Sequence, residues 1–424
     1  MTYLPLYLRL NYIVYVLFLS LPFLFILSRF FLEFVLILLS IIFLIKAMKS
    51  KDFSYFNNFF FKFFLIFYFY LLINHLTKSE ALVPSVIFYF RYGIYVLSIY
   101  YFLSNYKNIY FYFLKTTLLI ILFIAFDSIF QYFFKYNIIG LKIIEPHRVS
   151  SFFGDELILG GFTLRGILPF LILLLISKYK QIKPNLIYLG IVLCYLIIFL
   201  SGERIAFFSS ILLAFFYILF LNQNNEIKFF KKIFIVIVIL FLFFGFFLKD
   251  YQNRYHKQIL NDLNSKFIIT KEMIAPKKDL KDSYIFLSGL HHNMLLTGLN
   301  IFKDNIFFGS GPRSYRIVCA DEKYSINVFS CQSHPHNFTI QILSETGIVG
   351  FLFYITFLII LIREIFRLKL KRDKKSFLKL SILGFYLVTF LPMAPSGNFF
   401  NNWLSIMIYL PASFYLYLEN KKEF

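Results

Sequence analysis

Charged residues are scarce in this sequence, because Asp, Glu, Lys and Arg together make up only 15% of its 424 residues. Hydrophobic residues make up 59% and aromatic residues 22%, and the mean hydropathy is +0.73. A chain of this composition cannot be an ordinary soluble enzyme. It also lacks a basic stripe with interleaved stacking aromatic residues outside its apolar stretches. The formal net charge of +21 therefore does not indicate a nucleic-acid partner.

Two motifs of soluble nucleotide-using enzymes are also missing. The sequence has no Asp-x-Asp pair, which argues against a metal-bound nucleotide-sugar donor. The Gly-rich stretch GSGPRSYR at 309–316 lacks the Lys-Ser/Thr ending of a P-loop. We expect this stretch to form a tight turn that brings Arg313 or Arg316 toward the membrane surface.

Long apolar stretches recur along the chain, each of about 16 to 22 residues, which is enough to cross a hydrocarbon core about 30 Å thick. Because that core has no water to satisfy backbone groups, such stretches must be helices. The predicted fold is an all-α polytopic membrane protein with about twelve transmembrane helices. The predicted spans are 11–28, 30–45, 59–74, 82–103, 113–134, 160–177, 184–200, 205–221, 232–248, 344–362, 378–392 and 403–418.

The connections between these spans differ in charge. Every even-numbered connection is basic, and the tenth, from Arg363 to Lys379, is the richest in Lys and Arg. Basic loops stay in the cytoplasm, so both termini are predicted to be cytoplasmic. The chain then divides into the first nine helices at 1–248, a large periplasmic loop subdomain at 249–343, and the last three helices at 344–424.

Two of the three cysteines, Cys319 and Cys331, lie in the predicted periplasmic subdomain. That compartment is oxidising, so a pair so close in sequence is predicted to form a disulfide. Closing a loop of this size would stabilise the fold by about 3 kcal/mol in the chain-entropy account. Because Cys331 shortly precedes His334, we expect the bridge to hold the histidine segment in place. The alternative is a pair of free thiols.

The segment CQSHPHNFTIQILSETGIVG at 331–350 carries the strongest chemical signal in the sequence. His334, His336 and Asn337 stand there at the entrance of a membrane helix. Pro335 biases His334 toward extended geometry, so the two imidazoles cannot share a helix face. A histidine of near-neutral pKa is the usual general base for a hydroxyl nucleophile. The alternatives are a histidine pair that caps the next helix with Asn337 as N-cap, or a metal site, for which two ligands are too few.

Several arginines are candidates for binding an anion at the outer membrane face. Arg204, in SGERIAFF, begins an apolar helix, and a guanidinium beside free backbone N–H groups suits a phosphate. Arg148 and Arg165 bracket the other long outer loop, and Arg165 lies inside a span, where a charge is costly enough to indicate function. The structural alternatives are that Arg204 is neutralised by the preceding glutamate or extends to the interface, and that Arg165 pairs with Asp155 or Glu156.

SGERIAFF, LNIFKDNIFFGSGPRSYR and HPHNFTIQILSETGIVG, together with the large outer loop between the ninth and tenth spans, resemble the O-antigen ligase and O-antigen polymerase superfamily of bacterial envelope glycosyltransferases. The resemblance implies an inner-membrane enzyme whose active site faces the periplasm. It implies an undecaprenyl-pyrophosphate-linked glycan as the donor and no metal or cofactor. The acceptor would be lipid A-core for a ligase and another lipid-linked repeat for a polymerase.

By this resemblance, His336 matches the catalytic position and Arg204 a phosphate-binding one. The family often has an arginine several residues before LNIFKDN, where this chain has His291-His292. That cationic role falls either to one of these two histidines or to one of the other arginines. The candidate substrate-binding residues are Arg204, Arg148, Arg165, Arg313, Arg316, His292, His334 and Asn337.

Two other classes of membrane protein are alternatives to the glycosyltransferase hypothesis. A polytopic transporter would line a solute path with Arg204 and Arg165. Transporters often show paired half-repeats and broken helices near the midplane, whereas no repeat is visible here and the polar candidates gather on the outer side. A structural or assembly protein would fit if the histidine segment were packed and inert.

Overall fold

The computed structural model describes residues 6–78, 83–178, 181–220, 228–229, 231–235, 239, 289–327, 330–371, 373–392 and 394–421. The regular structure in these ranges is helical, and the only strand-like feature described in them is an isolated bridge between Tyr136 and Lys142. A helix satisfies its own backbone groups, which an apolar chain in a bilayer requires. The all-α prediction is confirmed for the described part of the chain.

The helices form two groups along the sequence, separated by residues outside the described ranges. The first group contains α1 (Leu6–Leu27), α2 (Arg29–Ser50), η1 (Ser54–Phe56), α3 (Phe59–Lys78), α4 (Pro84–Ile87), η2 (Phe88–Phe90), α5 (Arg91–Asn105), α6 (Ile109–Phe134), η3 (Ser151–Phe153), α7 (Leu159–Phe162), η4 (Thr163–Ile167), α8 (Leu168–Ser177), α9 (Pro184–Leu200) and α10 (Arg204–Phe220). The second group contains α14 (Gly289–Asp304), α15 (Tyr315–Val318), α16 (Phe338–Lys371), α17 (Lys374–Thr389) and α18 (Asn402–Asn420).

Each predicted span except the ninth coincides with a helix or a continuous helical run. The ninth, 232–248, lies largely outside the described residues. Among the described residues, 6 helices are long and apolar enough to cross a membrane, so the chain is a membrane protein. These are Arg29–Ser50, Phe59–Lys78, Pro84–Asn105, Ile109–Phe134, Leu159–Ser177 and Phe338–Lys371. The shorter apolar helices are Asn11–Leu27, Pro184–Leu200 and Arg204–Phe220.

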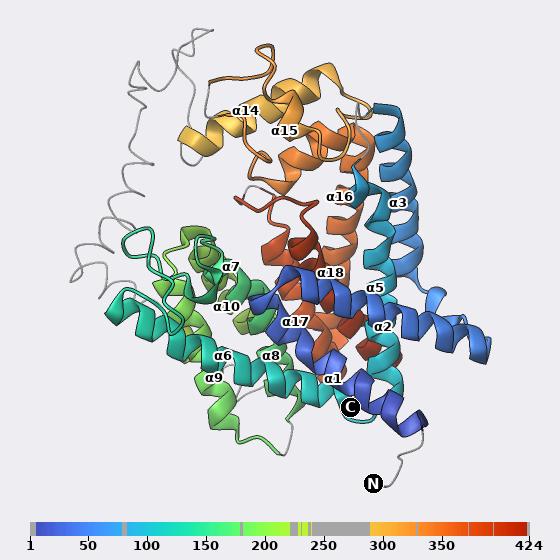
Figure 1. Ribbon diagram of the computed structural model, residues 1–424, viewed down its shortest axis with the longest axis vertical. Coiled ribbons are helices and arrows are strands. Elements are labelled where there is room, and N and C mark those ends of the chain that lie inside the picture. The colour runs from blue at the N-terminus through green and yellow to red at the C-terminus, as the bar shows by residue number, and fades with distance from the viewer. Residues whose placement is uncertain are drawn as a thin grey trace.

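The two groups pack around one aromatic-rich core. In Figure 1, α6, α8, α9 and α10 lie together at the lower left, and α3 and α5 run beside α16 on the right. The C-terminal helices fill the centre, where α18 packs along α5 and α17 packs against α8 and α10. Large side chains such as Phe18, Phe43, Phe102 and Phe113 are fully buried there. The core therefore joins the first and last thirds of the chain.

The predicted loop subdomain at 249–343 is described from residue 289 onward, and residues 249–288 lie outside the described ranges. In its described part, α14 packs against α16, and α15 also contacts α16. Both short elements lie beyond one end of α16, at the top of Figure 1. This part of the chain thus caps the end of the helix that follows the histidine segment.

Helix α16 is interrupted at Gly347, where φ is 62° and ψ is −167°. The segment 306–311 crosses the helix at this break, and its backbone is joined to that of residues 344–349 by hydrogen bonds of 2.8 to 3.2 Å. A Cβ on Gly347 would lie 2.4 Å from the carbonyl of Phe307, and one on Gly309 would lie 2.4 Å from the carbonyl carbon of Glu345. Only glycine fits two backbones at this separation. The GSGP stretch therefore does form a turn, and the turn locks onto α16.

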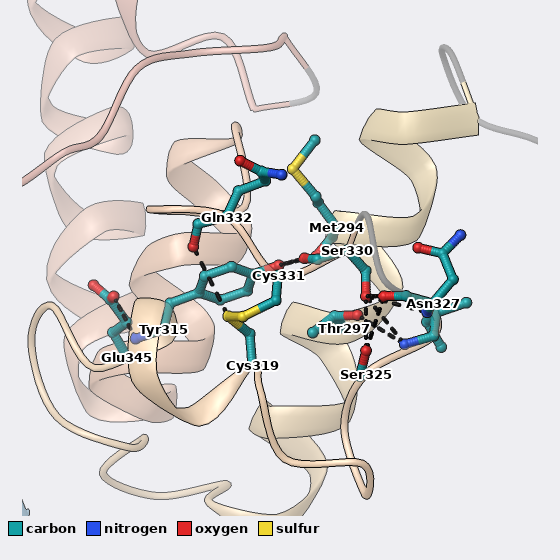
Figure 2. The surroundings of a disulfide bond; sticks show 11 residues. Met294, Thr297, Tyr315, Cys319, Ser325, Asn327, Ser330, Cys331, Gln332 and Glu345 are labelled. Carbon is teal, nitrogen blue, oxygen red and sulfur yellow. Dashed lines mark hydrogen bonds between the residues drawn. A yellow bond between two sulfur atoms is a disulfide. The ribbon is translucent and has the colours of Figure 1, made fainter. Parts of the chain in front are cut away.

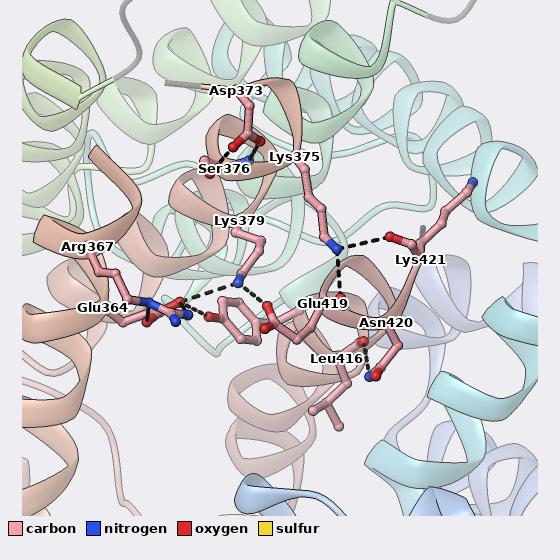
Figure 3. A network of polar contacts seen from close by, with 11 residues as sticks. Glu364, Arg367, Asp373, Lys375, Ser376, Lys379, Leu416, Glu419, Asn420 and Lys421 are labelled. Atoms are coloured by element: carbon pink, nitrogen blue, oxygen red, sulfur yellow. Dashed lines mark hydrogen bonds and ion pairs between the residues drawn. The ribbon is translucent and has the colours of Figure 1, made fainter. Parts of the chain in front are cut away.

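The opposite end of α16 carries a buried ion cluster. Lys379 of α17 is 4% exposed and lies 3.3 Å from Glu364 of α16, and it also pairs with Glu419 of α18 (Figure 3). Arg367 and the hydroxyl of Tyr415 contact the same Glu364 at 2.6 Å. Because a buried charge is stable only when paired, this cluster fixes the relative positions of the last three helices.

Candidate active site

The histidine segment is held in a compact, irregular conformation just before α16. His336 has a φ of 52°, a left-handed conformation that non-glycine residues rarely adopt. Its carbonyl accepts a hydrogen bond of 2.8 Å from the N–H of Ser396, in the loop before α18. Strained backbone of this kind is found mostly where the surroundings hold it for a function. The segment is therefore held from the C-terminal loop as well as from its own chain.

Three imidazole rings meet at this point. The ring of His336 stacks on that of His334, with centroids 4.0 Å apart and an interplanar angle of 33°. The ring of His291, from α14, meets His336 edge-on at 5.6 Å. Nevertheless, no group of three or more His, Cys, Asp or Glu side chains in the described ranges could hold a metal ion. The three rings thus form a stacked cluster with a different geometry from a ligand set.

The two histidines of the motif have different environments. His334 is buried, its Nδ1 lies 2.9 Å from the hydroxyl of Ser333, and its Nε2 lies 3.3 Å from the carbonyl oxygen of Ser396. His336 is only partly buried, and its ring contacts within the described residues are the two stacked histidines, with no hydrogen bond to either ring nitrogen. His334 can therefore orient its neighbour, while His336 can accept a proton from a bound molecule.

Burial and positive charge keep both rings neutral near pH 7. Burial, followed by the charge of His336, lowers the pKa of His334 to about 3. Burial, followed by the charge of His291, lowers the pKa of His336 to about 4. A neutral imidazole can act as a general base, and its strength rises when an anion binds nearby and stabilises the protonated form.

Asn337 is the N-cap of α16. Its side-chain oxygen accepts a hydrogen bond from the N–H of Ile340 at 3.0 Å. Its amide nitrogen donates to the carbonyl oxygens of Pro392 and Ala394 at 3.0 and 3.2 Å. These bonds match the capping role weighed as an alternative for Asn337. The side chain therefore positions the segment and has little capacity left for substrate.

The remaining polar residues of the motif join three chain segments. Gln341 donates to Glu345 at 3.1 Å and to Asn398 at 2.9 Å, and it accepts from the N–H of Phe399 at 2.8 Å. The fully buried Glu345 accepts from the N–H of Tyr315 at 3.0 Å. The segments around 315, 341 and 398 are thus tied together below the histidines. Sequence reasoning missed this role, although a buried Gln and Glu one helical turn apart were a possible signal.

A disulfide joins Cys319 to Cys331, with the two Cα atoms 5.0 Å apart (Figure 2). Tyr315 lies beside it, and its hydroxyl donates to the carbonyl oxygens of Met294 at 3.0 Å and Ser330 at 2.8 Å. The bridge therefore connects the end of α15 to the chain that leads into His334. It is a second restraint on the histidine segment, in addition to the hydrogen bond from Ser396.

A second cluster of predicted residues lies at the start of α7. The carboxylate of Glu203 accepts hydrogen bonds from the N–H groups of Gly160 at 2.6 Å and Gly161 at 3.1 Å. Burial raises the pKa of Glu203 to about 7, although these bonds and the charges of Arg148 and Arg165 oppose the rise. Sequence reasoning had treated Glu203 only as a possible counter-ion of the residue that follows it. Its position between a helix N-terminus and two arginines was not foreseen.

Arg165 lies in the π-helical turn η4, in the first half of the helical run from Leu159 to Ser177. Pro169 has no N–H to donate to the carbonyl of Arg165, which accounts for the wider turn there. The sequence suggested Glu156 as a possible partner of Arg165. This suggestion was wrong, because Glu156 pairs with Arg29 of α2. Glu203 is the carboxylate whose charge acts on Arg165. Arg148 instead contacts Glu145 at 3.1 Å.

The other candidate residues lie at three places, namely the histidine cluster, the α7 cluster and a position beside α4. Arg204 begins α10 directly after Glu203, so its backbone lies next to the α7 cluster. His291 meets His336 edge-on. Arg313 donates to the hydroxyl of Ser85 in α4. The turn at 309–312 therefore directs this arginine toward α4.

Comparison with known proteins adds one finding. Residues 189–355 match the family model described as O-Antigen ligase. The matched segment contains Arg204, His291, His334 and His336, and it ends within α16. Arg148 and Arg165 lie outside it. No curated protein matches the chain.

Proposed function

We propose that this chain, whose residues 189–355 match the O-antigen ligase family model, moves a glycan from an undecaprenyl-pyrophosphate carrier to a sugar hydroxyl of lipid A-core. The observation that carries the proposal is the environment of His336. Its ring is partly exposed and neutral, it has no hydrogen bond from the described residues, and it is oriented by two other histidines. These are the properties required of a general base that acts on a bound hydroxyl.

The proposed reaction is a single displacement. A ring nitrogen of His336 takes the proton of the acceptor hydroxyl as its oxygen forms a bond to the anomeric carbon of the donor sugar. The bond between that carbon and the pyrophosphate oxygen breaks, and the electron pair leaves with the undecaprenyl pyrophosphate. Among the described residues, no carboxylate contacts the ring of His336 to act as a nucleophile, so we expect inversion at the anomeric carbon.

In this scheme, arginines of the α7 cluster stabilise the leaving group. Arg204 stands at the N-terminus of α10, where backbone N–H groups and a guanidinium can bind the same phosphate. Arg148 and Arg165 both act electrostatically on Glu203, which directly precedes Arg204. We therefore assign them the role of the arginine that the family often has where this chain has His291-His292. Fixed positive charge is worth most where negative charge grows during reaction.

The side of the membrane follows from the basic connections. If these are cytoplasmic, then both termini are cytoplasmic, and the histidine segment and the start of α10 face the periplasm of the inner membrane. Cys319 and Cys331 would then lie in an oxidising compartment, which agrees with the disulfide between them. The proposed reaction uses side chains of this chain and calls for neither a metal nor a cofactor.

Glycan profiling of a deletion strain tests this function. We expect lipopolysaccharide without polymer, and accumulation of polymer on the lipid carrier. Wild-type protein should restore the polymer, and His336→Ala should not. Gln332→Ala, an exposed side chain in the same segment, is the matched control and should restore it. Lipopolysaccharide with a single repeat would instead identify a polymerase, and an unchanged profile would contradict the proposal.

A further inference from the structure

A cavity of about 800 Å³ lies between α2, the α4–α5 segment and the chain at 313–317. Its walls are largely apolar, and they include Ile37, Ile41 and Leu44 of α2 together with Phe88 and Ile94. Ile37, Ile41 and Phe88 are also exposed on the outside of the molecule. The cavity is therefore open sideways, toward the region that lipid occupies around α2 and α5.

Three guanidinium groups and one carboxylate line this cavity, namely those of Arg91, Arg313, Arg316 and Glu33. Glu33 pairs with Arg91 at 3.3 Å. In the described part of the chain, neither Arg313 nor Arg316 forms an ion pair with a carboxylate; Arg313 donates to the hydroxyl of Ser85 instead. Burial, followed by the charge of Arg316, lowers the pKa of Arg313. The charged groups that line the cavity therefore carry an excess of positive charge, although the charge of the buried Glu345 also acts on Arg313 and Arg316.

An adjoining cavity of about 420 Å³ extends this space. It shares Glu33, Ile37 and Arg313 with the first cavity and reaches Arg29 and Trp403. An apolar wall that ends in guanidinium groups without an ion pair in the described part of the chain, those of Arg313 and Arg316, suits a molecule with hydrocarbon chains and an anionic head. The two connected cavities have room for more than one chain of such a molecule.

The cavity reaches the proposed active site through the loop that carries Arg316. Tyr315 is fixed by its bonds to Glu345 and Ser330, so the position of the next residue is well determined. The charge of Arg316 also contributes to the low pKa of His334. Arg316 thus acts on both the cavity and the histidine cluster. The cluster around Arg204 is built from different elements, α7 to α10.

We propose that this cavity holds the phosphorylated lipid end of the acceptor, and that Arg313 and Arg316 bind its phosphate, while the cluster around Arg204 holds the donor. The inference rests on the proposed function, because a transferase that joins two lipid-linked glycans needs two separate sites for anionic lipids. The shared chemistry of both possible acceptors is a phosphate at the lipid end. For the ligase function, the occupant is the phosphorylated lipid A portion of the acceptor.

Lipid binding by the purified full chain in phosphatidylcholine nanodiscs tests the inference without requiring transfer. The probes are diphosphoryl lipid A, its dephosphorylated form, and undecaprenyl pyrophosphate. The double variant Arg313→Gln/Arg316→Gln should weaken binding of diphosphoryl lipid A by about tenfold or more, because charge-assisted phosphate contacts are lost. Its affinity for undecaprenyl pyrophosphate should be unchanged. Wild-type protein should bind dephosphorylated lipid A as weakly as the double variant binds the phosphorylated form.

Two control variants complete the experiment. Lys303→Gln/Lys323→Gln removes the same charge from the same part of the chain, outside the cavity, and should bind lipid A like the wild type. Arg316→Gln alone, at an exposed position, provides the test if the double variant does not accumulate. Unchanged lipid A binding in a folded variant would overturn the inference, and so would a loss confined to undecaprenyl pyrophosphate. Failure of the proposed function would show differently, as wild-type protein that binds both lipids but transfers nothing.

Discussion

The low pKa of His336 predicts an unusual pH dependence of glycan transfer. A free histidine has a pKa of about 6.5, whereas burial and the charge of His291 lower that of His336 to about 4. A general base must be neutral to accept the proton, so activity should be lost as the pH falls through this pKa. The acid limb of kcat/KM, which reports the free enzyme, should therefore lie near pH 4, about 2.5 units below that of an unperturbed histidine.

Substrate binding should move the acid limb of the pH–rate profile to higher pH. The pyrophosphate of the donor is an anion, and a nearby anion stabilises the protonated imidazole and raises its pKa. The acid limb of kcat, which reports the enzyme–substrate complex, should therefore lie at higher pH than that of kcat/KM. His291→Gln removes the second cause of the low pKa and should shift the kcat/KM limb upward. The assay is transfer from purified donor between pH 3.5 and pH 8 (about the range that brackets both values), with folding checked at each pH. A wild-type limb near pH 6.5, unmoved by His291→Gln, would refute the reasoning.

Three further predictions concern single positions. Arg204→Ala should abolish transfer while the protein still accumulates, and Arg204→Lys should rescue it poorly, because one ammonium cannot reproduce the two-point contact of a guanidinium with phosphate; full activity of the Lys variant would contradict a bidentate role. Gly347→Ala places a Cβ 2.4 Å from backbone atoms at a positive φ, so it should lower the free energy of unfolding, measured in SDS, by about 2 to 5 kcal/mol. Gly140 also has a positive φ but open space around it, so Gly140→Ala should lower that free energy by only about 1 to 2 kcal/mol. Cys319→Ser/Cys331→Ser should lower stability by about 3 kcal/mol and reduce transfer, and unchanged transfer would show that the bridge does not position the histidine segment.

Much of the fold could be predicted from the sequence because membrane helices are long, apolar and flanked by charge. The break in α16 could not be placed, since it depends on the crossing of segment 306–311 rather than on a local signal. The GSGP stretch suggested a turn, but not that Gly309 and Gly347 face each other. Such a pairing joins positions far apart in sequence, which hydrophobic periodicity does not report.

The candidate site was predictable to a different degree for each residue type. His334 and His336 stood out because a bilayer-filling segment has no use for them. The hydrogen bonds of the His334 ring, which His336 lacks among the described residues, make their roles distinct. Glu203 and Glu345 were not identified, because their importance comes from backbone N–H groups on other segments. Glu156 was offered as a partner for a buried arginine from proximity in sequence, but three-dimensional packing pairs it with Arg29.

The central claim, that His336 is the base of a lipid-linked glycan transferase, is tested most directly by reconstituted transfer. Purified donor, lipid A-core acceptor and protein are combined in the presence of EDTA, with wild type, His336→Ala and Gln332→Ala compared at equal amounts of folded protein. The account predicts full transfer by the wild type and by Gln332→Ala in EDTA, and none by His336→Ala. Transfer that persists in His336→Ala would contradict it.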